Sequence, residues 1–233
     1  MSGYSISLII PVYNEEKIIE ASFLKNLKVL NSRNIDFEII IVNDGSKDNC
    51  RTIIEKLSKS YNLKVVEHPF NMGFGAAIRT GIQNSINEYI LCVPSDSPLD
   101  EENFLSFEEN LGKADLLISY RRKRLGYTWW MHINSIIYQQ LISKLFDMKL
   151  KDYNWIHLYH RKIFFDGKIQ IEYNGIFMLA EVLIKARNKS YTFIEFPVNQ
   201  TQRITGDASA SKLKNIIKTI KDVFHYYFSN KKS

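Results

Sequence analysis

The first part of the chain alternates short apolar runs with longer segments of helical spacing, and this alternation limits the possible folds more than any other feature. The run at 37–42 is apolar except at Glu38, and its end at 39–42 is continuously apolar, as in a strand that is buried on both faces. The predicted strands cover 5–10, 37–42, 63–67 and 89–93, and the predicted helices between them cover 15–30, 48–59 and 73–86. Strands and helices that alternate in this way form a parallel sheet with helices on both faces. The sequence therefore predicts an α/β fold of three layers, α/β/α, around a mostly parallel central sheet.

Beyond Pro94 the pattern is less regular, but nothing in it marks a domain boundary. Pro11 and Pro197 are expected to end the first and the last strand. The remaining helices are expected at 100–110, 129–146 and 177–186, and the remaining strands at 115–119, 156–159 and 191–195. No Gly-, Ser- or Pro-rich linker separates these elements. We therefore expect one domain over residues 1–210 and a basic amphipathic helix in 211–233.

Composition excludes several other classes of protein. With 45% apolar and 24% charged residues, the chain is typical of ordinary globular proteins. Its two cysteines, Cys50 and Cys92, are too few for a disulfide framework or a structural zinc site. No apolar run approaches the roughly 18 residues of a membrane span, and residues 1–15 lack the pattern of a signal peptide. We expect a protein that works in the reducing cytoplasm.

The positive charge of the chain is concentrated at its C-terminal end. The net charge is +6. Residues 201–233 hold seven Lys or Arg against two Asp, so that the rest of the chain is almost neutral. This distribution disfavours a nucleic-acid-binding protein, whose basic surface would extend over the fold, and it indicates a basic end segment with a partner of its own.

Polar residues and glycines follow each predicted strand of the first half, where ligands bind in an open parallel sheet. They are Pro11, Tyr13, Asn14 and Glu15 after the first strand, Asp44 after the second, 71–75 after the third, and Asp96 after the fourth. The alternative is that they only form turns and cap helices. Because all four strand ends carry such residues, a ligand site at this edge of the sheet is the stronger hypothesis.

The segment Asn71-Met-Gly-Phe-Gly75 is rich in glycine, but it does not indicate a dinucleotide site. The dinucleotide-binding fingerprint follows the first strand of its fold, whereas this motif follows the third. An oxidoreductase that uses a dinucleotide is therefore disfavoured. We expect the glycines to let the loop and the next helix pack close to a ligand, and Arg79 and Gly81 to be structural.

Three segments resemble the first three motifs of family 2 glycosyltransferases, in the same order and with similar spacing: Ile9–Glu16, Ile41–Ser46 and Asn71–Gly81. The resemblance covers about residues 5–210 and is closest to the branch that includes dolichyl-phosphate mannose synthase. It continues through Asp96, Arg121, Asp152, Glu195–Val198 and Arg203–Gly206. The resemblance implies the GT-A fold, with a nucleotide-sugar half in residues 1–110 and an acceptor half in residues 111–210.

The resemblance implies that the donor is a GDP- or UDP-sugar. Asp44 matches the family's partner for the base, and carboxylates readily accept hydrogen bonds from base N–H groups and ribose hydroxyls. The full set that it implies for the nucleotide sugar is Pro11, Tyr13, Asn14, Glu15, Asp44, Asn71, Gly73, Gly75 and Ser95.

The family places an Asp-x-Asp motif after the fourth strand, where it binds Mg²⁺ or Mn²⁺ against the diphosphate. Here the segment Pro94-Ser-Asp-Ser-Pro98 keeps only the second aspartate, Asp96. A hard cation is also stable with one carboxylate, the diphosphate and waters. We therefore expect a divalent metal with weak protein ligation at Asp96. The alternative is that Asp96 caps the helix that starts near Asp100.

Cationic residues dominate the acceptor half. A hydroxyl acceptor needs a general base, whereas a lipid phosphate is already anionic and needs cations. Family members that glycosylate hydroxyls carry a Glu-Asp pair late in the domain. This chain has only Glu181 there, with no acidic residue next to it. Arg121 matches the family's acceptor-phosphate arginine. Arg122 and Arg203 are the next candidates, and a solvated loop is the alternative for the run 121–124.

Asp152 lies at the position of a family aspartate and is expected to help position sugar or phosphate groups. The segment after it lacks the family's glycine, so the sugar specificity of that loop does not carry over. His157 and His160 have no partner carboxylate or cysteine nearby in the sequence, and we expect both to be structural.

Two segments have the composition of a membrane-facing surface. Trp129 and Trp130 open the helix at 129–146, and adjacent tryptophans suit a membrane interface. An apolar stripe of helical period runs through 211–228 and is flanked by lysines, as in helices that lie on anionic lipid. The alternatives are burial in the core for the first segment, and docking on the protein itself or on another subunit for the second.

Together these observations predict an inverting glycosyltransferase that moves a sugar from a nucleotide-diphosphate sugar to a polyisoprenyl phosphate, at the cytoplasmic face of a membrane. A separate membrane-spanning partner or a homo-oligomer is compatible with the sequence. One alternative is transfer to a glycan hydroxyl with Glu181 or Asp152 as base. The other is a non-catalytic member that only binds nucleotide sugar or membrane, as the prolines Pro94 and Pro98 would suggest.

Overall fold

The computed structural model describes residues 3–200 and 213–230 and shows one sheet of seven strands in this part of the chain. Its order is β3-β2-β1-β4-β6-β5-β7, and every neighbouring pair is parallel except the two that involve β6. The strands are β1 (Ser5–Val12), β2 (Asp36–Asn43), β3 (Lys64–Glu67), β4 (Tyr89–Cys92), β5 (Leu116–Arg121), β6 (His157–His160) and β7 (Phe193–Val198). The prediction of a mostly parallel sheet is thus confirmed.

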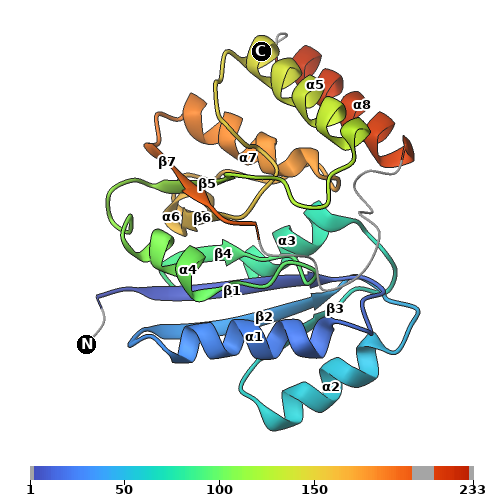
Figure 1. Ribbon diagram of the computed structural model, residues 1–233, viewed down its shortest axis with the longest axis vertical. Coiled ribbons are helices and arrows are strands. Elements are labelled where there is room, and N and C mark those ends of the chain that lie inside the picture. Colours follow the sequence, from blue (N-terminus) through green and yellow to red (C-terminus); the bar gives the residue numbers. More distant parts are fainter. Residues whose placement is uncertain (1–2, 201–212, 231–233) are drawn as a thin grey trace.

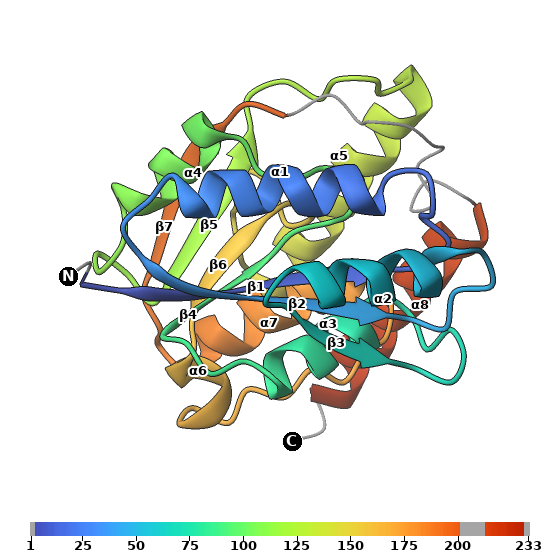
Figure 2. The same ribbon diagram turned by 90° about the horizontal axis from the view of Figure 1, so that it is seen from below.

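Helices cover both faces of the sheet, as Figures 1 and 2 show. They are α1 (Ile19–Asn31), α2 (Cys50–Ser60), α3 (Phe74–Gln83), α4 (Glu101–Glu108), α5 (Trp129–Phe146), α6 (Lys162–Phe165), α7 (Phe177–Asn188) and α8 (Leu213–Asn230). The core residues of α1, α2 and α4 form one apolar cluster with the sheet, and those of α3, α5, α7 and α8 form another. This is the expected three-layer α/β/α architecture.

Side chains along β1 alternate between the two faces of the sheet, and this explains why helices pack on both faces. Leu8 and Ile10 belong to the cluster under α1 and α2, and Ile9 between them belongs to the cluster on the opposite face. All three side chains are fully buried. A central strand with apolar residues on both faces needs helices on both sides, because either face would otherwise be exposed to water.

Two prolines lie inside strands that were expected to end at them. Pro11 pairs in register with Val42 of β2. An N–H at this position would point to the other side of β1, toward β4, and β4 has already ended there. Pro197 lies in β7, which is an edge strand and pairs only with β5. In both places the sheet loses no hydrogen bond to the proline, so both expected strand ends were wrong.

The C-terminal helix packs on the domain with one of its faces. Val223 and Tyr226 are buried, and the Tyr226 ring lies 5.6 Å from that of Phe177 and 5.7 Å from that of Phe146, measured between ring centroids. Figure 1 shows α8 beside α5 at the top of the view. Docking of this helix on the chain itself, one of the two alternatives, is therefore observed. Within residues 3–200 and 213–230, no helix combines the length and the apolar character needed to cross a membrane.

Candidate active site

Because β6 alone runs against the others, the carboxyl ends of β1–β5 and β7 lie along one edge of the sheet, here named the carboxyl rim. Asp44 follows β2 and Asp96 follows β4, on either side of β1. Two strand spacings of about 4.8 Å separate the axes of β2 and β4, which is roughly 10 Å in all. The segments that the sequence singled out are thus brought together at one edge of the sheet.

The loops after β1 and β2 are tied together by Asn14. Its backbone N–H donates to Ser46 Oγ at 3.0 Å, and its side-chain oxygen accepts from the Lys47 N–H at 2.8 Å. Asn14 has a φ of +56°, which is unusual for a residue other than glycine. Next to it, the Tyr13 side chain is exposed at the carboxyl rim. Asn14 therefore shapes the loop, and Tyr13 is the aromatic group that the loop presents.

Asp44 is buried, and its carboxylate holds the loop that follows β3. It accepts hydrogen bonds from the backbone N–H groups of Met72 and Gly73, each at 2.9 Å, and contacts His68 Nδ1 at 2.7 Å. In this structure both oxygens of Asp44 accept hydrogen bonds from protein groups, and through them Asp44 fixes the segment 71–75. His68 is absent from the sequence-based set, because a single histidine after a strand carries no motif.

The two glycines of this loop approach protein backbone, so packing within the protein already requires glycine at both positions. A Cβ on Gly73 would lie 2.5 Å from the Asn174 carbonyl oxygen, and one on Gly75 would lie 2.2 Å from the Tyr173 carbonyl oxygen. The Gly75 N–H donates to the Asn174 carbonyl at 2.8 Å. These positions exclude a side chain because the segment 171–174 packs directly against them.

Arg79 and Gly81 are structural, as predicted. The Arg79 guanidinium donates to the Ile171 carbonyl at 2.8 Å and to the Asn174 side-chain oxygen at 3.1 Å. A Cβ on Gly81 would lie 2.4 Å from Ile9 Cγ2, so glycine here lets α3 pack directly on β1. Both residues therefore stabilise the support beneath the glycine loop.

Glu181 holds the same segment from behind. Its carboxylate has no exposed surface and accepts from the backbone N–H groups of Glu172 at 2.9 Å and Tyr173 at 3.2 Å. It also forms an ion pair with Lys185 at 2.7 Å. A carboxylate with these partners and no exposure has no route to an acceptor hydroxyl, so the structure gives Glu181 a supporting role in place of the base considered above.

Asp96 lies in a tight turn directly after β4. The Ser97 N–H donates to the Pro94 carbonyl at 3.1 Å, so that Asp96 occupies the third position of the turn, next to the buried Ser95. Asp96 does not cap α4. That position belongs to Asp100, whose side chain accepts from the Asn103 N–H at 2.7 Å. The capping alternative for Asp96 was therefore wrong, and the turn places the residue at the carboxyl rim.

The antiparallel strand β6 brings Asp152 to the carboxyl rim, where it meets Arg121 at the end of β5. The guanidinium donates to both carboxylate oxygens, from Nε at 2.8 Å and from Nη2 at 3.1 Å, and the two side chains are only 5% and 4% exposed. Tyr127 accepts a third hydrogen bond at 2.7 Å, and the Trp155 ring centroid lies 4.5 Å from the guanidinium carbon. Burial alone would raise the pKa of Asp152. The charges of Arg121 and Arg124 and the hydrogen bonds that it accepts outweigh burial and lower that pKa.

The remaining cations of this loop differ in exposure. Arg122 and Lys123 are exposed, whereas Arg124 is half-buried, with its Nη2 3.7 Å from the Asp152 carboxylate and its Nη1 bonded to Ser135. The Arg122 N–H donates to the Val198 carbonyl at 3.0 Å, which fixes the start of the loop at the rim. Arg203, the other predicted cation, lies outside the described residues.

The two histidines of β6 have structural surroundings, in agreement with the prediction. His157 is buried, and burial lowers its pKa to about 4. His160 accepts from the Lys162 N–H at 3.1 Å, and its ring lies against Tyr89. Neither contacts the groups expected to bind the donor.

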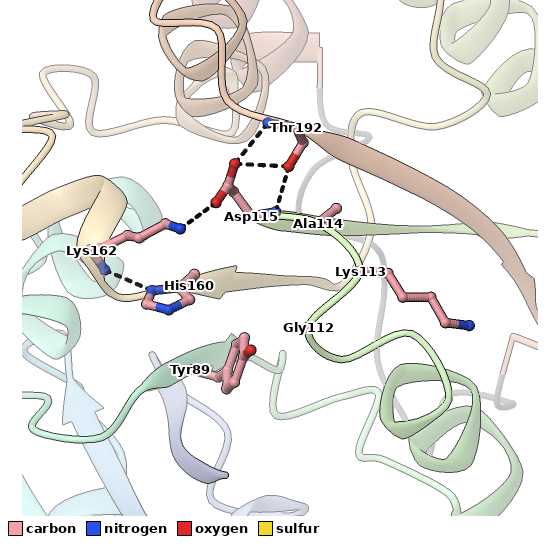
Figure 3. A pocket seen from close by; sticks show the side chains of 8 residues that line it. All are labelled: Tyr89, Gly112, Lys113, Ala114, Asp115, His160, Lys162 and Thr192. Carbon is pink, nitrogen blue, oxygen red and sulfur yellow. Dashed lines mark hydrogen bonds and ion pairs between the residues drawn. The ribbon is translucent and has the colours of Figure 1, made fainter. Parts of the chain in front are cut away.

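A cavity of about 300 Å³ lies at the opposite edge of the sheet, at the amino ends of β4, β5 and β7 (Figure 3). Two of its charged groups, Asp115 and Lys162, already pair with each other. Asp115 contacts Lys162 Nζ at 2.6 Å and accepts from the Thr192 N–H at 2.9 Å. Burial opposes this ionisation, but Lys162 and Thr192 together lower the pKa of Asp115 to about 2. These contacts fasten the starts of two strands, and they set the cavity apart from the carboxyl rim.

Comparison with known proteins shows which family this chain resembles. A family model described as "Glycosyl transferase family 2" matches residues 7–169. This range contains every sequence-predicted site residue except Arg203. Among curated proteins, the dolichyl-phosphate beta-glucosyltransferase ALG5A of Trichomonas vaginalis is 35% identical over 112 residues, which are 46% of this chain and 35% of that protein.

A second relative matches along most of the chain. It is the undecaprenyl-phosphate 4-deoxy-4-formamido-L-arabinose transferase of Proteus mirabilis, which is 24% identical over 213 residues, covering 91% of this chain and 64% of that protein. The chain thus spans between about a third and two thirds of the length of these relatives.

Among solved structures, the glucosyl-3-phosphoglycerate synthase of Mycobacterium tuberculosis, in complex with Mn²⁺, UDP and glucosyl-3-phosphoglycerate, has a TM-score of 0.70. The match covers 95% of this chain and 80% of that one at 16% identity. At this identity the likeness concerns the fold, which is GT-A.

Proposed function

The chain belongs to glycosyltransferase family 2, and from this premise we propose that it moves a sugar from a nucleotide-diphosphate sugar to a polyisoprenyl phosphate. The names of two relatives specify lipid phosphates, dolichyl in one and undecaprenyl in the other. The observation in this chain that carries the proposal is the charge at the acceptor side of the carboxyl rim. Exposed cations lie there, and each described carboxylate that the hydroxyl-acceptor alternative would use as a base is buried in an ion pair.

The donor would occupy the half formed by residues 1–110, at the loops after β1, β2, β3 and β4. Tyr13 is exposed there for stacking on the base, and Pro11, Asn14 and Glu15 belong to the same loop. Asp44 with Asn71, Gly73 and Gly75 would form the opposite wall. Ser95 lies beside Asp96 in the turn where the diphosphate is expected. The acceptor half would comprise residues 111–210, with 211–233 as the terminal helix.

At the turn after β4, the protein would supply only a small share of the ligands of a divalent metal. Within 3–200 and 213–230 no group of three or more His, Cys, Asp or Glu side chains is arranged to hold an ion. One carboxylate at Asp96 suits Mg²⁺ or Mn²⁺ that takes its other ligands from the diphosphate and water. The fold relative crystallised with Mn²⁺ and UDP supports this choice. When bound, the metal would neutralise charge that develops on the leaving diphosphate.

The acceptor phosphate carries its own negative charge, so no general base is required. One of its oxygens forms a bond to the anomeric carbon while the bond from that carbon to the donor diphosphate breaks. The nucleoside diphosphate leaves with the electron pair, and the configuration inverts. Arg122 is the exposed guanidinium best placed to hold the incoming phosphate, and Arg203 remains a candidate. Arg121 and Asp152 would act as one unit that shapes the wall beneath it.

A membrane surface would supply this acceptor, and α5 and α8 carry exposed apolar groups suited to it. Trp129 and Trp130 are 71% and 53% exposed, so the core-burial alternative for these two side chains was wrong. On α8, Phe224 and Phe228 are exposed, and Lys214, Lys218 and Lys221 are exposed as well. These features support a peripheral position on the cytoplasmic face, with or without a membrane-spanning partner or a second copy.

The activity is tested by incubating the protein with radiolabelled GDP- or UDP-sugars, Mg²⁺ or Mn²⁺, and either undecaprenyl phosphate or an oligosaccharide. We expect a lipid-extractable labelled product with the lipid phosphate only. Product with the oligosaccharide alone would favour the hydroxyl-acceptor alternative. Binding of nucleotide sugar without turnover on either acceptor would favour a non-catalytic member of the family.

Membrane association gives a separate prediction. Replacing both Trp129 and Trp130 by alanine should weaken binding to vesicles of phosphatidylglycerol and phosphatidylcholine at least about tenfold, because each ring would lose its burial in the interface. Vesicle co-sedimentation measures this. Ile86→Ala is a matched control, since Ile86 is a highly exposed apolar residue that precedes β4, away from the tryptophan pair. Equal binding by all three proteins would contradict the assignment of this surface.

A further inference from the structure

His68 forms a hydrogen-bonded chain with Asp44 and Thr80 that no catalytic motif accounts for. His68 directly follows β3, and its backbone N–H donates to the Asn43 carbonyl at 2.9 Å, which aligns it with the end of β2. Its Nδ1 lies 2.7 Å from Asp44 Oδ1, and its Nε2 lies 2.9 Å from Thr80 Oγ1 on α3. The ring is buried.

The chemistry of these partners fixes the role of each ring nitrogen. An ionised carboxylate only accepts hydrogen bonds, so Nδ1 must carry the proton in the contact with Asp44. In a neutral ring Nε2 then accepts from the Thr80 hydroxyl, whose hydrogen can rotate to point at the ring. The ring is thereby held at both ends, between the loop after β2 and the body of α3.

Asp44 transmits this constraint to the loop of the donor site. The same carboxylate oxygen that contacts His68 also accepts from the Met72 N–H at 2.9 Å, and the other oxygen accepts from the Gly73 N–H at 2.9 Å. The loop also packs on the turn after Asp44, since a Cβ on Gly45 would lie 2.4 Å from the Phe70 carbonyl carbon. The segment 70–73 is thus wrapped around Asp44, and His68 is the side chain that orients the carboxylate.

We propose that His68 is a positioning residue for the nucleotide-sugar donor, acting through Asp44 on the loop that carries Asn71. This inference rests on the proposed function, because it concerns the donor side of the same site. His68 itself is buried and would not touch the donor. Loss of its Nδ1 donor would leave the Asp44 carboxylate held by the two backbone N–H groups of the loop itself, so the loop would be less firmly fixed to the end of β3.

Three substitutions at one position separate positioning from folding. Asparagine places an amide N–H near the position of Nδ1, glutamine places its amide near Nε2, and alanine provides neither. We expect His68→Ala and His68→Gln to raise the donor KM about tenfold with little change in kcat or in the acceptor KM. We expect His68→Asn to recover most of the wild-type donor KM. Direct nucleotide-diphosphate binding by calorimetry should follow the same order.

Two further variants keep the test decisive if His68→Ala does not fold. Thr80→Val removes the hydroxyl while keeping the shape, and it should raise the donor KM only about two- to threefold, since the contact of His68 with Asp44 remains. His160→Ala, at the opposite edge of the sheet, should leave the donor KM unchanged.

Each outcome bears on a different claim. If His68→Ala lowers the melting temperature and leaves the donor KM unchanged, the role of His68 is structural only and the inference fails. The inference also fails if asparagine and alanine at position 68 raise the donor KM equally. If the wild-type protein binds no nucleotide sugar or diphosphate at all, the proposed function itself fails.

Discussion

The variant Asp96→Asn should lose at least about a hundredfold in turnover while its melting temperature stays close to that of the wild type. Asp96 is the one acidic side chain retained from the family's metal-binding motif, and it lies in the turn after β4 at the carboxyl rim. Asparagine keeps the size of the side chain but removes its negative charge, which would weaken a cation bound to the diphosphate. Stabilisation of the charge that develops on a leaving group commonly contributes a factor of about 100 or more to the rate.

The matched control lies four residues further along the chain. Asp100 caps α4, so Asp100→Ala should lower the free energy of unfolding by about 1 kcal/mol and leave turnover nearly intact. Steady-state assays and urea unfolding on both variants provide the comparison. Full turnover by Asp96→Asn would exclude a catalytic role for this residue, and a large loss of stability in it would show that Asp96 supports the fold.

The second large effect concerns stability. Asp152→Ala should lower the free energy of unfolding by roughly 3–5 kcal/mol, because it leaves the Arg121 guanidinium charged, buried and without its carboxylate. The double variant Arg121→Met with Asp152→Ala should recover part of this loss, since it removes the most deeply buried charge and leaves only Arg124, which keeps its hydrogen bond to Ser135. Urea unfolding of the two single variants and the double variant measures the coupling directly.

Dependence on pH gives an independent check of the same pair. The pKa of Asp152 is lowered in the folded protein, so the pair contributes stability above the ordinary pKa of an aspartate, and this contribution is lost as the pH falls through the folded value. The Asp152→Ala variant should lack this component of acid destabilisation. As a control, Glu55→Ala in the highly exposed Arg51–Glu55 pair should change stability by less than about 0.5 kcal/mol. Equal effects at Asp152 and Glu55 would contradict the interpretation of a buried pair.

Contacts made by single loops were the part that the sequence did not reveal. Gly73 and Gly75 lie against the backbone of residues 173–174, about a hundred positions away in the chain, and nothing in the sequence indicated this contact. The same holds for Glu181, whose partners are the backbone N–H groups of a neighbouring segment. The residues next to a glycine or a lone glutamate in the sequence do not specify which distant segment will pack against it. Only the folded chain shows which segment that is.

The sequence by itself determined the α/β class, the mostly parallel sheet and the place of the loops after its first four strands, at the carboxyl rim. These follow from local periodicity and from the handedness of strand–helix–strand units, which a chain of this pattern cannot avoid. Tertiary structure alone decided that β6 runs antiparallel and carries Asp152 to Arg121, and that Asp44 meets His68. Such pairs depend on the register and direction of strands, and side chains far apart in the sequence carry no local signal of where they will meet.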